Sequence, residues 1–471
     1  MVFSSAIFLL AFLPVTFILY YVLPGRMAKN VLLLLASLLF YSFGEPVFVF
    51  LMIFSVLLNY IFGLFAAKGG TKGRAAVALA AVVNIGILCV FKYTDFIIGN
   101  INMIPGIKLP FTGIVMPIGI SFFTFQALSY VVDTYRDNTL VQKNFFNLLL
   151  YVSFFPQLIA GPIVRYEDIA KELYNRKADA KDIAEGFRRF IFGLAKKLIV
   201  SNAMAGVSDL VFDNFSGSQY NVVVCWLGAI FYTLHIYYDF SAYSDMAIGL
   251  GRMFGFHFRE NFMHPLSAKS IQDFWRRWHI SLSTWFKEYV YIPLGGNRKG
   301  SARRTLNKFI VFFLTGLWHG AGWNFVIWGM IHGITLTVED FIKEKTGSKK
   351  DHSVIGRIYT LFIVVIAFVF FRAETFSGAL AFLKGMFTGF DFASVSVLST
   401  MITPWFIFVL AIALLFSCPL LGTVKKLTVE RGGKLGRVFE AGSYAITLAL
   451  LAFCLLALST ADFNPFIYFR F

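Results

Sequence analysis

The sequence predicts an all-α, polytopic membrane protein with roughly ten to twelve transmembrane or re-entrant helices. Hydrophobic residues make up 58% of the 471 residues and charged residues only 14%, against about 45–50% and about 25% in soluble domains. The apolar residues also gather in runs near the roughly 20 residues that cross a bilayer core. These observations exclude a water-soluble globule and predict one integral-membrane domain over residues 1–471.

The apolar runs recur along the whole chain. They are Val2–Leu23, Val31–Tyr41, Val47–Ala66, Ala75–Phe91, Leu148–Leu158, Phe190–Val211, Val222–Tyr238, Phe309–Leu317, Trp323–Leu336, Ile358–Phe371, Pro404–Leu421 and Ala441–Leu458. Several runs are too short to cross a bilayer straight and are broken by Gly, Pro or polar residues. Irregular backbone survives at membrane depth only where protein or a water-filled cavity covers it, so we expect a cavity within the membrane.

The charged residues give the expected orientation. Lys and Arg number 42 and Asp and Glu 26, which gives a net charge of +16. In a soluble protein this excess of positive charge would suggest a nucleic-acid partner. Here the cations lie in short segments between apolar runs, as in cytoplasmic loops. The segments are Arg26–Lys29, Lys68–Arg74, Lys171–Lys197, Arg298–Lys308, Lys343–Lys350 and Lys425–Arg437. We expect a lipid bilayer as partner, no nucleic acid, and a first run that is retained as a span.

The cysteines and the common glycine motifs indicate no metal or nucleotide chemistry. Cys89, Cys225, Cys418 and Cys454 lie in apolar runs without C-x-x-C spacing, so we expect small buried side chains, no metal site and no bound cofactor. The chain has no G-x-x-x-x-G-K-[ST], H-E-x-x-H or G-x-S-x-G string. Nucleotide-driven motors, metalloproteases and α/β-hydrolases are therefore disfavoured.

The segment Ala268–Pro293 predicts an amphipathic helix at the membrane interface. Its large apolar residues recur at spacings of three and four, as on one helical face: Trp275, Trp278, Leu282, Trp285 and Tyr289. His279 lies inside this segment. The helix could lie along the membrane or line a funnel, and residue pattern alone favours an anchor among the headgroups with His279 as an interface histidine.

His319 lies in the run Phe312–Trp323, which contains no other ionisable residue. An ionisable group at membrane depth is a functional candidate. On a continuous helix Thr315, Gly316, Gly322 and Trp323 would border the imidazole, and the small residues would leave room for a narrow ligand. The alternative is that the glycines allow close helix packing and that His319 donates a structural hydrogen bond.

Asp239 and Asp245 lie in an otherwise apolar stretch, where a buried carboxylate must be paired, hydrogen-bonded or neutral. Either could orient an imidazole. Their six-residue spacing does not place them on one helix face, and we expect structural pairing with Arg252, Arg276 or Arg277.

The string Leu294–Gly300 could form a backbone nest for phosphate, reinforced by Arg298 and Lys299. A basic cytoplasmic turn is the alternative. The string is a weak indication of a phosphate site.

Three strings taken together resemble the membrane-bound O-acyltransferase family. They are Asp273–Phe286 with His279, Tyr291–Asn297, and Leu317–Ala321 with His319. The strings Met1–Ser5, Met116–Gln126, Phe155–Arg165 and Phe466–Phe471 resemble one branch of that family, the membrane component of alginate O-acetylation and its relatives. The resemblance spans nearly the whole chain.

The resemblance implies a ring of tilted helices around a central tunnel, with His319 as the catalytic residue and His279 at the second functional position. We expect His319 to act as base and His279 to bind the thioester or stabilise the oxyanion. The other candidates, for supporting roles or substrate binding, are Asp239, Asp245, Trp278, Ser283, Trp318 and Asn324, with Arg298 and Lys299 as weaker ligands for donor phosphates.

The expected reaction is transfer of acetyl from a cytoplasmic thioester, acetyl-CoA, to a hydroxyl on a cell-surface polysaccharide or on an extracytoplasmic partner protein. The expected location is the bacterial inner, or plasma, membrane. One alternative is D-alanyl transfer from a carrier protein to teichoic acid. Another is a transporter with a His/Asp relay.

Overall fold

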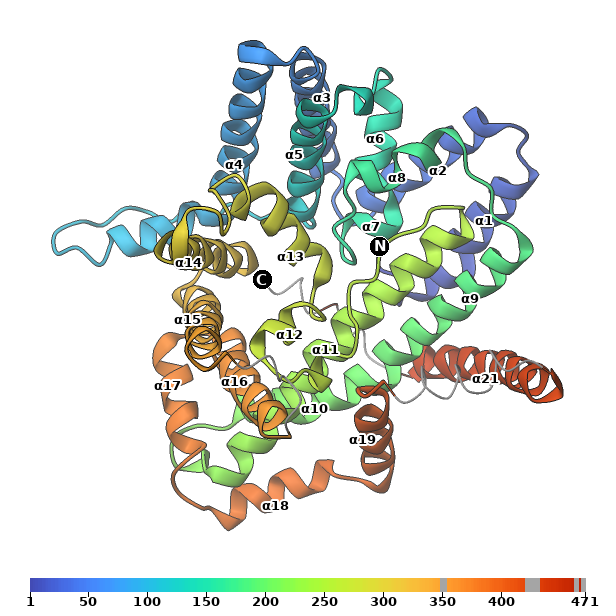
Figure 1. The fold of residues 1–471 in the computed structure, drawn as a ribbon. Coiled ribbons are helices and arrows are strands. Elements are labelled where there is room, and N and C mark those ends of the chain that lie inside the picture. Colours follow the sequence, from blue (N-terminus) through green and yellow to red (C-terminus); the bar gives the residue numbers. More distant parts are fainter. Residues whose placement is uncertain (348–353, 420–432, 461–465, 467–471) are drawn as a thin grey trace. The chain divides into compact units, whose positions relative to one another are not determined.

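The computed structural model describes residues 1–347, 354–419, 433–460 and Phe466 (Figure 1). Within these ranges the regular secondary structure is helical throughout, as the sequence predicts. Most of the predicted basic segment Lys425–Arg437, the end of the segment Lys343–Lys350, and the string Phe466–Phe471 apart from Phe466 lie outside the described residues.

The chain divides into two compact units. Unit 1 contains residues Met1–Phe190 and Ser244–Glu260, and unit 2 contains Ile191–Tyr243 and Asn261–Phe471. The helices that begin in unit 1 are α1 (Leu13–Val22), α2 (Arg26–Ser42), α3 (Phe48–Ala66), α4 (Gly70–Ile101), α5 (Ile120–Arg136), α6 (Phe145–Ser153), α7 (Phe155–Leu158), α8 (Tyr166–Tyr174) and α9 (Ala180–Ala195). Those that begin in unit 2 are α10 (Asn202–Asp209), α11 (Val222–Met253), α12 (Ile271–Trp275), α13 (Ile280–Phe286), α14 (Gly300–His319), α15 (Trp323–Thr346), α16 (Val354–Arg372), α17 (Phe376–Gly385), α18 (Phe392–Met401), α19 (Pro404–Phe416) and α21 (Gly433–Thr460).

Seven helices of the described residues are long and apolar enough to cross a membrane, or eight if the bent pair α18 and α19 forms one span. The other predicted runs form shorter pieces. For example, Leu148–Leu158 divides between α6 and α7, where Pro156 follows the first residue of α7. The chain is therefore a polytopic, all-α membrane protein in which several helices are too short to span.

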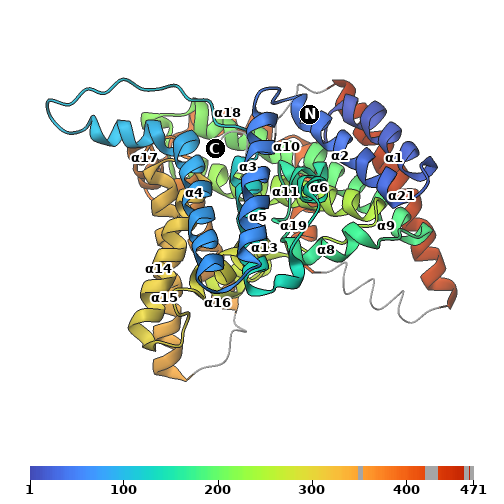
Figure 2. The same cartoon turned by 90° about the horizontal axis from the view of Figure 1, so that it is seen from above.

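In unit 1, apolar helices pack side by side, and a buried polar pair joins two of them. Helices α3 and α5 run side by side (Figure 2), and α3 joins α4 through Asn59 and Asn84, which are 1% exposed. Each side-chain amide donates to the oxygen of the other, at 3.0 and 2.8 Å. A reciprocal pair of this kind satisfies polar groups that lipid could not satisfy.

In unit 2, α14 and α15 form a tightly packed hairpin. A Cβ atom added to Gly316 would lie 2.4 Å from the carbonyl oxygen of Phe325, and one added to Gly329 would lie 2.2 Å from that of Phe312. Any side chain larger than hydrogen at either position would separate the two backbones. The glycines therefore hold the end of α14, where His319 lies, against α15.

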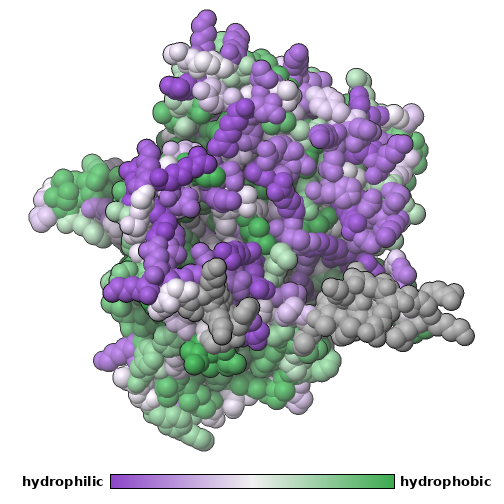
Figure 3. All heavy atoms as spheres, viewed as in Figure 1, coloured by the Kyte–Doolittle hydropathy of each residue, from purple (hydrophilic) through white to green (hydrophobic). Residues whose placement is uncertain are grey.

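The distribution of apolar residues on the surface agrees with a membrane protein. Hydrophobic residues gather over α17 and α18 of unit 2, whereas hydrophilic residues cover much of unit 1 around α8 (Figure 3). The exposed apolar side chains of α17 and α18 include Phe376, Leu380, Phe392 and Val397. Apolar side chains on the outside of a membrane protein face lipid.

Candidate active site

The expected helix over Ala268–Pro293 is wrong, because the chain breaks at His279. Helix α12 ends at Trp275 and α13 begins at Ile280, and His279 has φ +43° and ψ +55°, in the left-handed region. A non-glycine residue rarely adopts this conformation, and where it does the surrounding structure must hold it there. His279 is therefore placed at a turn between two short helices, and its neighbours are not those of a helix.

Asn261 holds this turn from the segment before α12. Its backbone carbonyl accepts a hydrogen bond from Ile280 N–H at 3.0 Å. Its side-chain Oδ1 accepts from Ser281 N–H at 3.1 Å and from Ser281 Oγ–H at 2.9 Å, and lies 3.2 Å from His279 Nδ1. Asn261 and His279 are both fully buried.

These bonds determine which nitrogen of His279 carries the proton. A backbone N–H can only donate, so its bond to Asn261 fixes Oδ1, an acceptor, toward His279. The proton of a neutral imidazole then lies on Nδ1, and Nε2 carries the lone pair. Burial lowers the pKa of His279 to about 3, so the ring is neutral near pH 7. Nε2 has no hydrogen-bond partner among the described residues.

His319 is the last residue of α14 and is 3% exposed. Its ring centroid lies 6.4 Å from that of His279. Edge-to-face contacts with Trp318, Trp328 and Phe371, at 4.9, 4.8 and 5.2 Å, surround the imidazole. The structure therefore brings together the two histidines that are 40 positions apart in the sequence, inside one aromatic cluster.

The expected open space beside His319 is wrong. Helix α14 ends at His319 and α15 begins at Trp323, so Gly322 and Trp323 do not continue the same helix. Gly316 and Gly320 are both covered by Phe325. The alternative interpretation of these glycines, close helix packing, is the one that the structure confirms.

A cavity of about 230 Å³ lies between α12, α13, α14 and α15. Neither histidine is among its lining residues, but Thr315 lies one turn before His319, and Ser283 N–H donates to the carbonyl oxygen of His279 at 3.1 Å. Its walls are largely apolar, and the lining residues are Gln272, Trp275, Arg276, Leu282, Ser283, Phe286, Lys287, Tyr291, Lys308, Val311, Phe312, Thr315 and Leu336. Ser283 Oγ and Trp275 Nε1 are buried without a hydrogen-bond partner among the described residues. The cavity thus combines apolar walls, cations and unsatisfied polar atoms.

The two aspartates are paired, but not with the expected arginines. Asp239 Oδ1 lies 2.6 Å from Lys197 Nζ, with side-chain exposures of 0% and 1%, and it accepts from Ser201 Oγ–H at 3.2 Å. In unit 1, Asp245 Oδ1 lies 2.8 Å from Arg189 Nη2. The expectation failed because the partner of each carboxylate comes from the segment before α11, at a sequence distance that no local pattern reveals.

The other predicted site residues lie at different places in unit 2. Trp318 contacts both histidines, with its centroid 5.8 Å from that of His279, whereas Trp278 stacks on Phe274 at 5.4 Å. Asn324 donates a hydrogen bond to Ala373 O at the start of α15. Arg298 and Lys299 lie at an exposed turn, and the cations that line the cavity are Arg276, Lys287 and Lys308.

Sequence reasoning missed several residues of this cluster. Phe240 meets His279 edge-on at 4.6 Å, and Phe466, fully buried, lies 4.0 Å from Tyr243 and 5.9 Å from Phe240. His332 is fully buried on α15, with its ring 5.2 Å from Trp328 and from Trp275. Its position in an apolar span was the available signal, as it was for His319.

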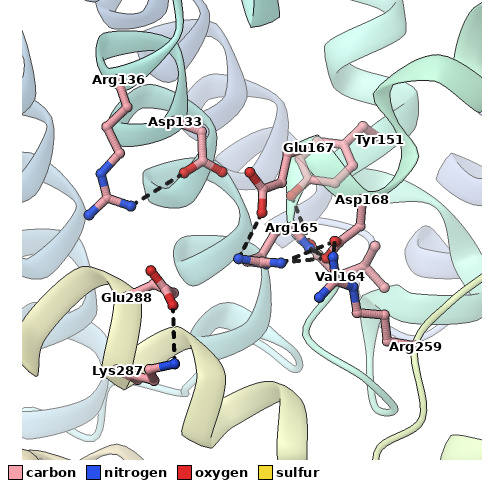
Figure 4. Close-up of polar contacts among 10 residues, drawn as sticks. All are labelled: Asp133, Arg136, Tyr151, Val164, Arg165, Glu167, Asp168, Arg259, Lys287 and Glu288. Carbon is pink, nitrogen blue, oxygen red and sulfur yellow. Dashed lines mark hydrogen bonds and ion pairs between the residues drawn. The ribbon is translucent and has the colours of Figure 1, made fainter. Parts of the chain in front are cut away.

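Unit 1 has a polar cluster of its own, around Arg165 at the start of α8 (Figure 4). Arg165 lies 2.8 Å from Glu167 and 3.1 Å from Asp168, and Asp168 also pairs with Arg259 at 2.6 Å. Arg165 and Asp168 are mostly buried. The arrangement caps the first turn of α8 and fixes the end of the string Phe155–Arg165.

Comparison with known proteins agrees with the motif resemblance. The model of the membrane-bound O-acyltransferase family matches residues 33–371. A probable alginate O-acetylase of Pseudomonas putida is 38% identical over the full length of both chains. The peptidoglycan O-acetyltransferase of Helicobacter pylori is 37% identical over 82% of this chain and 80% of its own length. The teichoic acid D-alanyltransferase of Bacillus subtilis is 30% identical over 55% of this chain and 68% of its own length.

Proposed function

Because this chain belongs to the membrane-bound O-acyltransferase family, we propose that it moves an acetyl group from a cytoplasmic thioester, acetyl-CoA, to a hydroxyl outside the membrane. The acceptor would be a cell-surface polysaccharide or an extracytoplasmic partner protein. We place the reaction in the inner, or plasma, membrane of a bacterium. The observation that carries the proposal is the pair of buried histidines, 6.4 Å apart between ring centroids, on the elements that also line a cavity with apolar walls and cations.

In the proposed reaction His319 is the base. Its neutral imidazole takes the proton of the acceptor hydroxyl, and the hydroxyl oxygen attacks the thioester carbonyl carbon. The bond from carbon to sulfur then breaks, and the imidazolium returns the proton to the leaving thiolate. The aromatic rings around His319 support this role, because an apolar environment disfavours the protonated form.

For His279 the geometry favours a role different from the expected oxyanion donor. With the proton on Nδ1 and held by Asn261, Nε2 can only accept a hydrogen bond while the ring is neutral. We assign His279 the orientation of the acceptor: its Nε2 would accept a hydrogen bond from another hydroxyl of a polysaccharide acceptor, while His319 takes the proton of the hydroxyl that attacks. Correct placement of the two reactants is a large part of the catalytic advantage in such a reaction.

The cavity would receive the donor. Trp275, Phe286 and Phe312 offer apolar surface to its thioester arm. Arg276, Lys287 and Lys308 offer positive charge to its phosphates, although Lys308 also pairs with Asp340. This placement is better supported than the turn with Arg298 and Lys299.

Acetyl is favoured over D-alanyl because relatives named as O-acetylases match this chain over its full length, whereas the D-alanyltransferase matches about half of it. A transporter is disfavoured, because the family consists of acyltransferases.

The test uses purified protein in vesicles that receive acetyl-labelled CoA, together with cell-surface polysaccharide as acceptor. We expect label in the polysaccharide with the wild type and with His235→Gln, which alters another buried histidine, and labelling about 10²- to 10⁴-fold slower with His319→Gln. Equal turnover by His319→Gln and wild type would refute the role of His319. Turnover of a D-alanyl carrier protein, with none of acetyl-CoA, would overturn the proposed donor.

A further inference from the structure

Residues 103–115, which follow α4 in unit 1, form an arm whose side chains are all exposed. Most of them are apolar: Met103 is 76% exposed, Val115 68% and Phe111 64%. Ile104, Ile107, Leu109 and Ile114 are exposed as well. The arm reaches sideways, away from α3 and α5, in Figures 1 and 2, and it is covered by hydrophobic residues in Figure 3. A continuous group of exposed apolar side chains of this kind marks an interaction surface.

The arm has a defined conformation. Asp95, near the end of α4, accepts hydrogen bonds from Thr112 N–H and Oγ1–H at 2.8 and 2.7 Å and from Gly113 N–H at 3.0 Å. Asn102 binds both the N–H and the carbonyl oxygen of Leu109, at 2.7 and 2.9 Å. These two side chains hold the apolar residues outward on an ordered loop.

The arm is continuous with a surface that faces lipid. Helix α4 is a candidate membrane span, and its side chains Val82, Ile85, Val90 and Ile97 are exposed. At 1.5 Å per residue, about 20 of its 32 residues already cover the roughly 30 Å of a bilayer core. The end of α4 and the arm therefore reach the membrane interface.

The composition of the arm fits lipid better than protein. Residues 103–115 contain no Trp, Tyr or Arg, the residues that dominate the energetics of protein interfaces. Lys108 is their only charged residue, and a single cation beside apolar side chains suits headgroups above acyl chains. Since α4 begins inside the basic segment Lys68–Arg74, which should be cytoplasmic, its other end lies on the extracytoplasmic side.

We propose that residues 103–115 form a lipid-binding arm, which inserts Met103, Phe111 and Val115 into the extracytoplasmic leaflet of the bilayer. Asp95 and Asn102 hold these side chains in place for insertion. The arm would fix the depth of the end of α4 in the membrane. This inference does not depend on the proposed reaction.

The test places a nitroxide label at Met103→Cys, Phe111→Cys or Val115→Cys in a chain whose four native cysteines are replaced by alanine. The protein is reconstituted at about one copy per vesicle of phosphatidylethanolamine and phosphatidylglycerol, so that lipid is the only partner present. Collisions with oxygen and with a water-soluble nickel chelate give the depth of each label. We expect depths of about 5–10 Å below the headgroup boundary, and free access to nickel for the control Asn138→Cys, at an exposed polar turn.

Equal nickel access at the arm and at Asn138 would overturn the proposal. If the nickel chelate reaches the labels on the arm in vesicles but not in native membranes, a protein and not lipid covers the arm, and the proposal is overturned. If the cysteine-free chain does not fold, Phe111→Trp in the native chain gives the same answer. Its added fluorescence should be quenched by lipids brominated near the headgroup, and an absence of quenching would refute insertion.

Discussion

His279 Nδ1 lies 3.2 Å from Asn261 Oδ1, and the same oxygen accepts the backbone N–H of Ser281. One amide oxygen thus holds both the imidazole and the left-handed turn that carries it. Neither residue reaches solvent. The orientation of His279 therefore depends on a residue 18 positions earlier in the chain.

Replacing Asn261 by leucine should impair catalysis. The change leaves Nδ1–H of His279 without its acceptor, which costs about 1–3 kcal/mol, or about 5- to 150-fold in kcat/KM if the loss falls on positioning. We expect the protein to remain in the membrane. The measurement is acetyl turnover by purified protein. The matched control is Asn221→Leu, which replaces a fully buried asparagine that caps α11. Equal losses in both variants would indicate a general effect on the fold.

Replacing His319 by glutamine should remove the proposed base. General acid–base catalysis contributes about 10²- to 10⁴-fold, so we expect kcat to fall within that range. KM for the donor should change little, because the cavity stays intact. The kinetic constants of His319→Gln, measured beside those of His235→Gln, check this. A variant that loses donor affinity and keeps kcat would place His319 in binding instead.

The pH dependence of activity should not arise from His279. Its pKa of about 3 lies below the ordinary value because burial penalises the charged ring, and an imidazole is neutral above its pKa. Between about pH 5 and pH 8 it therefore does not titrate. We expect His279→Asn to lower kcat/KM at every pH without shifting the acidic limb of the profile. A limb that disappears in this variant would show that His279 titrates in the wild type.

Part of the fold and of the candidate site could be predicted from the sequence, and part could not. Apolar runs and basic loops predicted the helical class and the membrane location, because both depend on local composition. The motifs predicted that His279 and His319 belong together. The break at His279 could not be predicted, because a left-handed residue inside a helical pattern is held by tertiary bonds from Asn261. The pairing of Asp239 with Lys197 was likewise invisible, since it joins two segments 42 residues apart.

That buried pair should respond strongly to single substitutions. Lys197→Met leaves the buried carboxylate of Asp239 without its cation, which costs about 3–5 kcal/mol, whereas replacing both partners by apolar residues is often nearly neutral. We expect Lys197→Met to lower the unfolding temperature in detergent and the double variant Lys197→Met/Asp239→Leu to recover most of the loss. Additive losses in the double variant would argue against direct coupling of the pair.

The α14–α15 hairpin should not tolerate a methyl group at its contact. A Cβ at position 329 would lie 2.2 Å from the carbonyl oxygen of Phe312, so we expect Gly329→Ala to destabilise the protein by about 1–3 kcal/mol. Gly86→Ala is the control, because a Cβ there meets no atom within 4 Å and alanine favours the helix by up to about 1 kcal/mol. Thermal unfolding should move in opposite directions for the two variants. Equal shifts would contradict the close packing.

The same hairpin bears on how this enzyme could be altered by directed evolution. Main-chain atoms of α15 hold the end of α14 through Gly316 and Gly329, so the backbone under His319 does not rely on the identity of neighbouring large side chains. Exposed positions such as Leu306 and Phe313 on α14 or Ile334 and Val338 on α15 can then change freely among apolar residues. Libraries that vary the cavity wall and leave these two glycines untouched should retain the catalytic geometry while they explore new acyl donors.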